Sequence, residues 1–130
     1  MPLDHIGIHV DAKRHPMVKE WYEKALKPVG YQKFRTEGEN EEIAGFSYNA
    51  KNCEWWVLSA PEPPNLPMHF AFRVDNRAQV DEFHRIGVAA GGRCNGPPGL
   101  RPHYGANYYA AFVFDPVGNN VEVLCLEARE

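Results

Sequence analysis

Two stretches of the chain alternate between hydrophobic and other residues with the two-residue period of a β-strand. In residues 3–10, Ile6, Ile8 and Val10 face one way, which sends His5 to the opposite face. Residues 68–74 repeat the pattern, and His69 falls opposite the hydrophobic face there. We therefore predict two strands that each carry one histidine on the less hydrophobic side.

Each of these strands precedes a segment with helical periodicity. Residues 16–29 carry a hydrophobic stripe and stop at Gly30. The second helix is predicted to begin at Asp75 or Asn76, where Gln79 follows in a capping-box position, and to end at a pair of glycines. Shorter strands are predicted at residues 31–35, 44–49, 53–59, 108–114 and 121–124, and a Pro/Gly loop at residues 96–105.

The order of these elements repeats. Residues 1–59 and 68–130 each run strand, helix, strands, and a proline-rich connector joins them within one domain. Each first strand has a small residue two positions after its histidine, and we align Asn52-Cys53-Glu54 with Asn120-Val121-Glu122. The predicted class is α+β, with two related halves whose equivalent residues converge on a central cavity.

The last strand contains the carboxylate Glu122, on the face opposite its β-branched neighbours. A carboxylate inside a sheet concavity needs a cation or hydrogen-bond donors. The hypothesis is one divalent metal ion, Zn, Ni, Fe, Mn or Co, held by His5, His69 and Glu122, with Glu54 as a possible second carboxylate. The alternatives are an ion pair between Glu122 and Arg73, and histidines that only form hydrogen bonds at the sheet edge.

Further polar and aromatic residues are candidates for a substrate-binding wall. One of them shares the face of His5 on the first strand, and the others lie in the second half of the chain. The candidates are His9, Arg73, Arg101, His103, Tyr104, Tyr108 and Tyr109. For the tyrosines, the alternative is simple packing at the edge of a strand.

Composition excludes several functional classes. A net charge of −3 gives no basic surface for nucleic acid. No hydrophobic run approaches the roughly 20 residues of a membrane span. Three widely spaced cysteines, without a C-x-x-C pair, indicate a reducing compartment, and we expect a cytoplasmic protein.

The motifs that begin at His5 (HIGIHV), Trp21 (WYEKAL) and His69 (HFAF), with the final run Asn107–Glu122, resemble the vicinal oxygen chelate superfamily. This superfamily includes glyoxalases, extradiol dioxygenases and bleomycin-resistance proteins. The resemblance implies paired βαβββ modules that form an open, cupped sheet around a metal site.

The same resemblance implies a function. It is a metal-dependent lyase or isomerase acting on a small metabolite chelated through vicinal oxygens, with Glu122 or Glu54 as the base. The alternatives are an extradiol-type Fe²⁺ dioxygenase, or a non-catalytic protein that binds small molecules. A homodimer is also expected from the resemblance, with no nucleic-acid or membrane partner.

Overall fold

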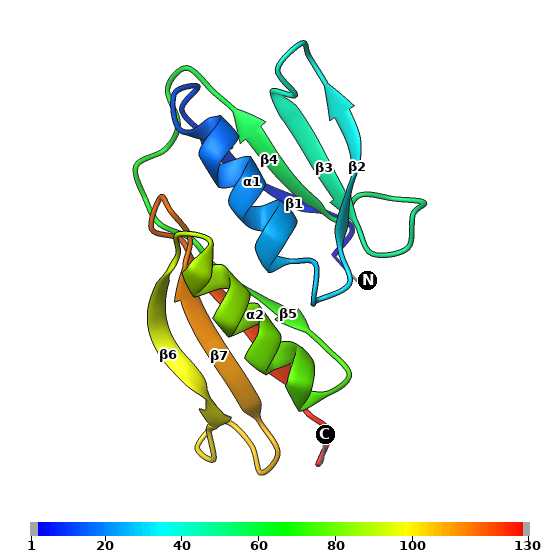
Figure 1. The fold of residues 1–130 in the computed structure, drawn as a ribbon, viewed down its shortest axis with the longest axis vertical. Coiled ribbons are helices and arrows are strands. Elements are labelled where there is room, and N and C mark those ends of the chain that lie inside the picture. Colours follow the sequence, from blue (N-terminus) through cyan, green and yellow to red (C-terminus); the bar gives the residue numbers. More distant parts are fainter. Residues whose placement is uncertain (1–2, 129–130) are drawn as a thin grey trace.

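The computed structural model describes residues 3–128, which form two four-stranded sheets and two helices (Figure 1). The strand order is β1-β4-β3-β2 in the first sheet and β5-β8-β7-β6 in the second. The elements are β1 (Ile6–Val10), α1 (His15–Ala25), β2 (Gln32–Glu37), β3 (Ile43–Ser47), β4 (Trp55–Ser59), β5 (His69–Arg73), α2 (Arg77–Ala89), β6 (Arg93–Leu100), β7 (Tyr109–Phe114) and β8 (Asn120–Cys125).

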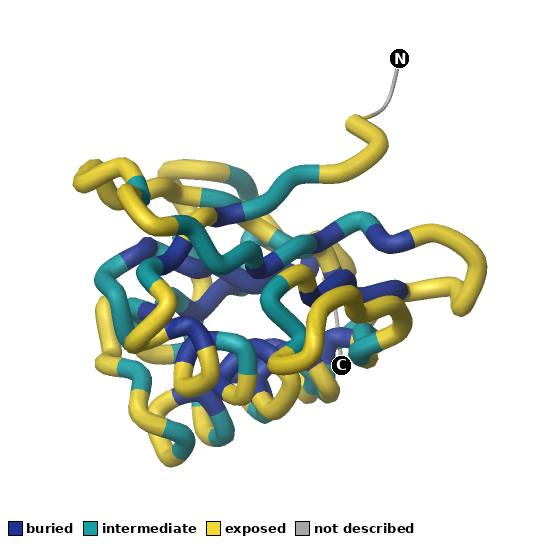
Figure 2. Tube along the Cα trace, turned by 90° about the horizontal axis from the view of Figure 1, so that it is seen from above, coloured by how far each residue is buried: buried dark blue, intermediate teal, exposed yellow. Residues whose placement is uncertain are grey.

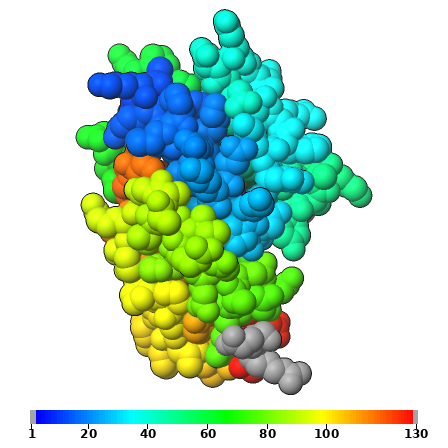
Figure 3. Space-filling model, viewed as in Figure 1, coloured from blue at the N-terminus to red at the C-terminus, as the bar shows by residue number. Residues whose placement is uncertain are grey.

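Each half of the chain has the same βαβββ order, and the predicted α+β class is confirmed. We call β1 to β4 with α1 the first module, and β5 to β8 with α2 the second module. The modules lie side by side, with the N-terminal and C-terminal colours in separate lobes (Figure 3). Both helices lie on the same side of the sheets, so the other face of each sheet has no helix over it; we call it the open face (Figure 1).

The predicted helix stripes form the core between the sheets and the helices. Tyr22 of α1, its C-cap residue Leu26, and Val80 and Phe83 of α2 are fully buried. Figure 2 shows this buried interior, with the exposed segments around it. The helices contact each other where the Trp21 indole N–H donates to the Gly87 carbonyl at 2.8 Å.

The predicted start of the second helix is confirmed in detail. Asn76 is the N-cap of α2, and its side chain accepts from the Gln79 backbone N–H at 3.0 Å. The Gln79 side chain accepts in return from the Asn76 N–H, which completes the capping box. The helix therefore begins where local sequence chemistry alone would start it.

The Pro/Gly loop predicted at residues 96–105 is wrong in its first half. Residues 93–100 form β6, an edge strand paired only with β7, with register shifts on both sides of Gly96. Prolines are compatible with an edge strand because only one side of it needs ladder hydrogen bonds. The loop begins after Leu100.

Strand register also corrects the alignment of the two halves. Gly7 of β1 pairs with Trp56 of β4, whereas Ala71 of β5 pairs with Glu122 of β8. Since Gly7 and Ala71 each lie two residues after their histidine, the counterpart of Glu122 is Trp56. The expected equivalence of Glu54 with Glu122 is therefore wrong by two positions.

The turn before β8 forms a hydrogen bond that connects the two modules. Asp115 accepts hydrogen bonds from the backbone of Val117 and Asn119, and Gly118 adopts a φ of 93°. The buried Tyr22 hydroxyl of α1 donates to the Asp115 carboxylate at 2.6 Å. Burial, and then the charge of Asp115, raise the pKa of Tyr22 well above its ordinary value, so the phenol stays a donor.

Candidate metal centre and its surroundings

A histidine and a carboxylate meet on the open face of the second sheet. Nε2 of His69 lies 3.2 Å from Oε1 of Glu122. β5 and β8 are parallel neighbours in which His69 pairs with Asn120 and Ala71 with Glu122, so the two side chains project from adjacent strands onto one face. The side chain of Glu122 is 5% exposed, whereas that of His69 is half exposed.

Hydrogen bonding determines which nitrogen of His69 is available. Nδ1 lies 3.0 Å from the backbone carbonyl oxygen of Asn120. A carbonyl only accepts, so Nδ1 carries the proton and donates. Nε2 then faces the carboxylate of Glu122 with either a second proton or a lone pair. A lone pair opposite a carboxylate oxygen is repulsive unless a cation lies between them. Metal-binding histidines are commonly oriented in the same way, with the other ring N–H donated to a carbonyl or carboxylate.

The second oxygen of Glu122 is engaged by a tyrosine. The Tyr108 hydroxyl donates a short hydrogen bond to Oε2. Burial, and then the hydrogen bond and charge of Glu122, raise the pKa of Tyr108 to about 12, while the charge of Arg73 lowers it by a smaller amount. The phenol is thus a proton donor fixed beside the carboxylate at neutral pH.

An aromatic ring that the sequence prediction missed completes this group. Phe112 pairs with Glu122 across β7 and β8, and its ring is stacked against His69 with centroids 6.4 Å apart. Phe112 also contacts Arg101, whose guanidinium carbon lies 5.4 Å from the centroid of the Phe112 ring. The signal was present in the sequence, because strand alternation puts Phe112 on the same face as Tyr108.

The loop between β6 and β7 adds the remaining predicted residues of the second module. Tyr104 contacts Tyr108 with centroids 5.3 Å apart, and His103 contacts Tyr104 at 4.1 Å. Tyr109 instead faces α2, where its hydroxyl donates to Asp81 at 2.6 Å. Neighbouring residues of a strand point to opposite faces, which separates Tyr109 from Tyr108.

The alternative of an ion pair between Glu122 and Arg73 is not observed. Within residues 3–128, Glu122 contacts His69 and Tyr108, and no ion pair joins it to Arg73. Arg73 lies at the end of β5 on the face of His69, exposed to solvent. Its charge reaches Tyr108 without a direct contact.

The predicted residues of the first module lie in a different place. His5 is exposed, and its Nδ1 lies 2.7 Å from Asp4. Its two neighbouring hollows are lined by residues such as Trp56, Cys53 and Leu58, all from the first module. Oε1 of Glu54 accepts from the Tyr48 backbone N–H at 3.1 Å. No cluster of three or more metal-ligating side chains occurs within residues 3–128 of one chain.

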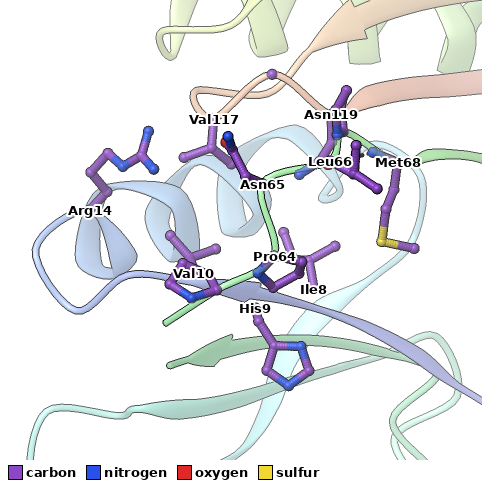
Figure 4. A pocket seen from close by; sticks show the side chains of 13 residues that line it. Ile8, His9, Val10, Arg14, Pro64, Asn65, Leu66, Met68, Val117 and Asn119 are labelled. Carbon is purple, nitrogen blue, oxygen red and sulfur yellow. Dashed lines mark hydrogen bonds between the residues drawn. The ribbon is translucent and has the colours of Figure 1, made fainter. Parts of the chain in front are cut away.

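A separate cavity of about 200 Å³ lies between the two modules, beneath the connector (Figure 4). Val117 and Asn119 are on one side of it and His9 is on the opposite side (Figure 4). Pro64 and Leu66 of the connector also line it, so His9 lies at this cavity between the modules, which Glu122 does not line.

The donor set fits a divalent ion, although only two donors are together in one chain. One imidazole and one carboxylate suit the borderline ions Zn²⁺, Ni²⁺, Fe²⁺, Mn²⁺ and Co²⁺. Their arrangement also fits, since Nε2 and Oε1 approach each other with the histidine held through its other nitrogen. Two ligands leave room for further donors.

The fold corresponds to that of known proteins. Residues 3–123 match the family model described as the Glyoxalase/Bleomycin resistance protein/Dioxygenase superfamily. The chain belongs to this superfamily, as its motifs indicated. No curated protein sequence matches it.

Solved structures share the fold at low sequence identity. A glyoxalase/bleomycin resistance protein from Albidiferax ferrireducens T118 is 23% identical with a TM-score of 0.71, covering 94% of this chain and 96% of that one. A family enzyme from Burkholderia phytofirmans PsJN is 18% identical with a TM-score of 0.69, over 98% and 100% of the two chains. Lactoylglutathione lyase from Agrobacterium tumefaciens is 17% identical with a TM-score of 0.62, over 95% and 94%.

Neither helix within residues 3–128 has the length and hydrophobicity needed to cross a membrane. Cys53, Cys94 and Cys125 are all free.

Proposed function

We propose that this protein is a metal-dependent lyase or isomerase of the glyoxalase type, acting on a small oxygenated metabolite at the open face of the second sheet. The observation that supports it most directly is the approach of His69 Nε2 to Glu122 Oε1 at 3.2 Å, with His69 Nδ1 committed to a backbone carbonyl. A cation bound between these atoms would remove the repulsion between the carboxylate and an Nε2 that carries a lone pair. The free cysteines fit a cytoplasmic location.

Each residue of the group has a defined task in this proposal. His69 and Glu122 hold the divalent ion, which supplies Lewis-acid polarisation of substrate oxygens when bound. Glu122 also accepts a proton from the substrate, as a carboxylate close to the reacting carbon does in general base catalysis. Tyr108 keeps one Glu122 oxygen oriented by donating to it. Phe112 and Tyr104 supply a hydrophobic wall.

We propose further that His5 comes from a second copy of the chain. Within one chain His5 belongs to the first module and is 60% exposed. The open face of the first sheet also exposes apolar surface, with Ile43 and Phe34 more than a third exposed. A homodimer that sets this face against the second sheet of its partner would cover that surface and add His5 to His69 and Glu122.

An extradiol-type Fe²⁺ dioxygenase is the second candidate, and one observation favours it. Trp56 occupies the position in β4 that corresponds to Glu122 in β8, and an indole is no metal ligand. Two histidines and one carboxylate would remain, which is the ligand set of non-haem Fe²⁺ oxygenases. Oxygen uptake with catechols, against isomerisation of 2-oxoaldehyde hemithioacetals, separates the two reactions.

Mixing two variants tests both the ligands and the dimer. His5→Ala and Glu122→Gln are each expected to lose bound metal when purified alone. When they are unfolded together and refolded, a mixed dimer contains one site with all three ligands. Metal uptake should therefore return to about a quarter of the wild-type stoichiometry, because about half of the dimers are mixed and each holds one of two sites.

Two other outcomes have clear meanings. Loss of metal without any recovery on mixing would reject the shared site while leaving the ligands intact. Retention of stoichiometric metal by both single variants would reject the ligand assignment. Unmixed His5→Ala, refolded in the same way, is the control for recovery caused by refolding alone.

A further inference from the structure

The glycine-rich edge strand β6 holds an arginine in a fixed place. Nη1 of Arg101 donates to the Gly99 carbonyl at 2.8 Å, and Nη2 donates to the Pro97 carbonyl at 2.8 Å. The same guanidinium lies against the ring of Phe112. Three restraints therefore act on a side chain that is usually mobile in solvent.

The two glycines of this strand leave room for the guanidinium. A Cβ added to Gly96 would lie 3.1 Å from Nη2 of Arg101, and one added to Gly99 would lie 3.3 Å from Nη1. Larger residues at either position would press on the guanidinium. The Gly-Pro-Pro-Gly segment thus holds the Arg101 guanidinium beside the Phe112 ring.

Two carbonyls satisfy only part of what a guanidinium can donate. Arg101 has five N–H donors, of which two are used in these bonds. No carboxylate of residues 3–128 forms an ion pair with it. A planar cation with spare donors, held in place before any ligand arrives, is suited to a carboxylate or phosphate.

The charge of the open face of the second sheet also favours an anionic ligand. Strand alternation brings nine residues of β5, β8 and β7 onto the open face of the second sheet, and Glu122 is the only acid among them. They are His69, Ala71, Arg73, Asn120, Glu122, Leu124, Ala110, Phe112 and Phe114. Besides Arg73, two more arginines lie against this face: Arg93 over the ring of Phe114 and Arg101 over the ring of Phe112. The face is thus positive although the chain as a whole carries −3.

We propose that the substrate carries an oxyanion group, a carboxylate or a phosphate, and that Arg101 binds it beside Phe112 while the oxygenated end of the molecule reaches His69 and Glu122. This inference rests on the proposed function for the identity of the site, and it adds the chemical class of substrate. Phe112 separates the two ends, since it contacts both the His69 ring and the Arg101 guanidinium. Arg73 strengthens the field from the opposite end of β5.

Arg101 has a purely structural alternative role. The register of β6 with β7 shifts between Gly96 and Gly99, which leaves carbonyls without regular ladder partners. Arg101 would then only satisfy the Pro97 and Gly99 oxygens. In that case its removal weakens folding and leaves anion binding unchanged.

Binding of two simple probes to chelator-treated protein distinguishes these roles. Malonate and inorganic phosphate are titrated separately, and NMR follows the Arg101 side-chain N–H and the backbone of Phe112. Saturable shifts with at least one probe are expected. Arg101→Gln should weaken that binding by about tenfold or more, because charge-assisted hydrogen bonds are lost. Arg101→Lys, which keeps the charge, should weaken it less.

Two further variants locate the site. Arg93→Gln is the matched control, as it removes the same charge and the same kind of aromatic contact from the other end of β6, and its affinity should stay within about twofold. Arg73→Gln should have a smaller effect than Arg101→Gln. A larger effect of Arg73→Gln, unsaturable shifts with both probes, or equal binding by wild type and Arg101→Gln would each overturn the proposal.

The titration is independent of the metal, because the ion has been removed. If the protein saturates with an anion but never takes up metal, the proposed function fails and the Arg101 site stands. If it takes up metal but no anion saturates it, only this inference fails.

Discussion

Trp56 in β4 occupies the place that Glu122 occupies in β8, each paired with the small residue two positions after a histidine, His5 or His69. The two modules therefore repeat their histidine but not their carboxylate. Glu54 lies two positions before Trp56 and accepts a hydrogen bond from the Tyr48 backbone. Its expected part in catalysis remains a prediction that no contact with His69 or Glu122 supports.

This asymmetry predicts different results for the two glutamates. Glu54→Gln should change metal affinity by less than about threefold, because the residue is not a ligand. Glu122→Gln should lower it by about 100-fold or more, since an amide is a far weaker ligand than a carboxylate. Competition with a chromogenic chelator measures both. A comparable loss in Glu54→Gln would restore it as a ligand.

Tyr108 and its neighbour Tyr109 provide a matched pair of variants. Tyr108→Phe removes the donor to Glu122, and loss of such an outer partner typically weakens a metal site by about tenfold or more. Tyr109→Phe removes the same hydroxyl from the opposite face, where it bonds Asp81. Chelator competition should show weaker metal binding for Tyr108→Phe alone. Equal affinities in both variants would contradict the role given to Tyr108.

The contact between Tyr22 and Asp115 is predicted to stabilise the joint between the modules. Tyr22→Phe deletes one buried hydrogen bond to a charged group and should lower the free energy of unfolding by about 1–3 kcal/mol. Urea denaturation measures this. Tyr48→Phe, at an exposed position, is the control and should be within about 0.5 kcal/mol of wild type. An unchanged midpoint for Tyr22→Phe would show that the bond contributes little.

His84 on α2 predicts part of the pH dependence of stability. Burial lowers its pKa, and the charge of Asp81 opposes this in part. The unfolded chain therefore takes up the proton at higher pH than the folded protein does. The stability contribution of His84 is fully present above the unfolded pKa of about 6.5 and is lost as pH falls toward the lower folded value.

Urea denaturation between pH 5 and pH 8 tests this prediction. In His84→Gln, stability should fall less steeply with acidification than in wild type, because one such group is gone. The Nε2 of His84 lies 3.1 Å from Cys94 Sγ, so Cys94→Ser is a useful companion variant. Identical slopes in wild type and His84→Gln would contradict the predicted shift.

Much of the fold was predictable because local chemistry and global packing agree. The stripe of Tyr22 and Leu26 is buried as its spacing indicated, and Asn76 caps its helix with Gln79. The edge strand at Gly96 was missed because its prolines and glycines read as a loop. These residues are compatible with a strand there because an edge strand has a partner on one side only.

The site was predictable only in part, for a reason of register. Alternation along one strand gives the face of a side chain, so His69 and Glu122 could be expected on the same side of the sheet. Which residues are neighbours across strands depends on pairing, and a shift of two residues keeps the face while changing the neighbour. That is why Glu54, rather than Trp56, was aligned with Glu122. The position of His5 relative to Glu122 depends on how whole modules pack, which no local pattern contains.

Elemental analysis of protein purified without added metal tests the central claim most directly. Wild type and Glu54→Gln are predicted to carry about one divalent ion per chain, and His69→Ala and Glu122→Gln to carry less than about a tenth of that. Circular dichroism of the same samples confirms that each variant is folded. Stoichiometric metal in either of the last two variants, or wild type that remains metal-free after incubation with all five ions, would contradict the assignment of a metal centre to His69 and Glu122.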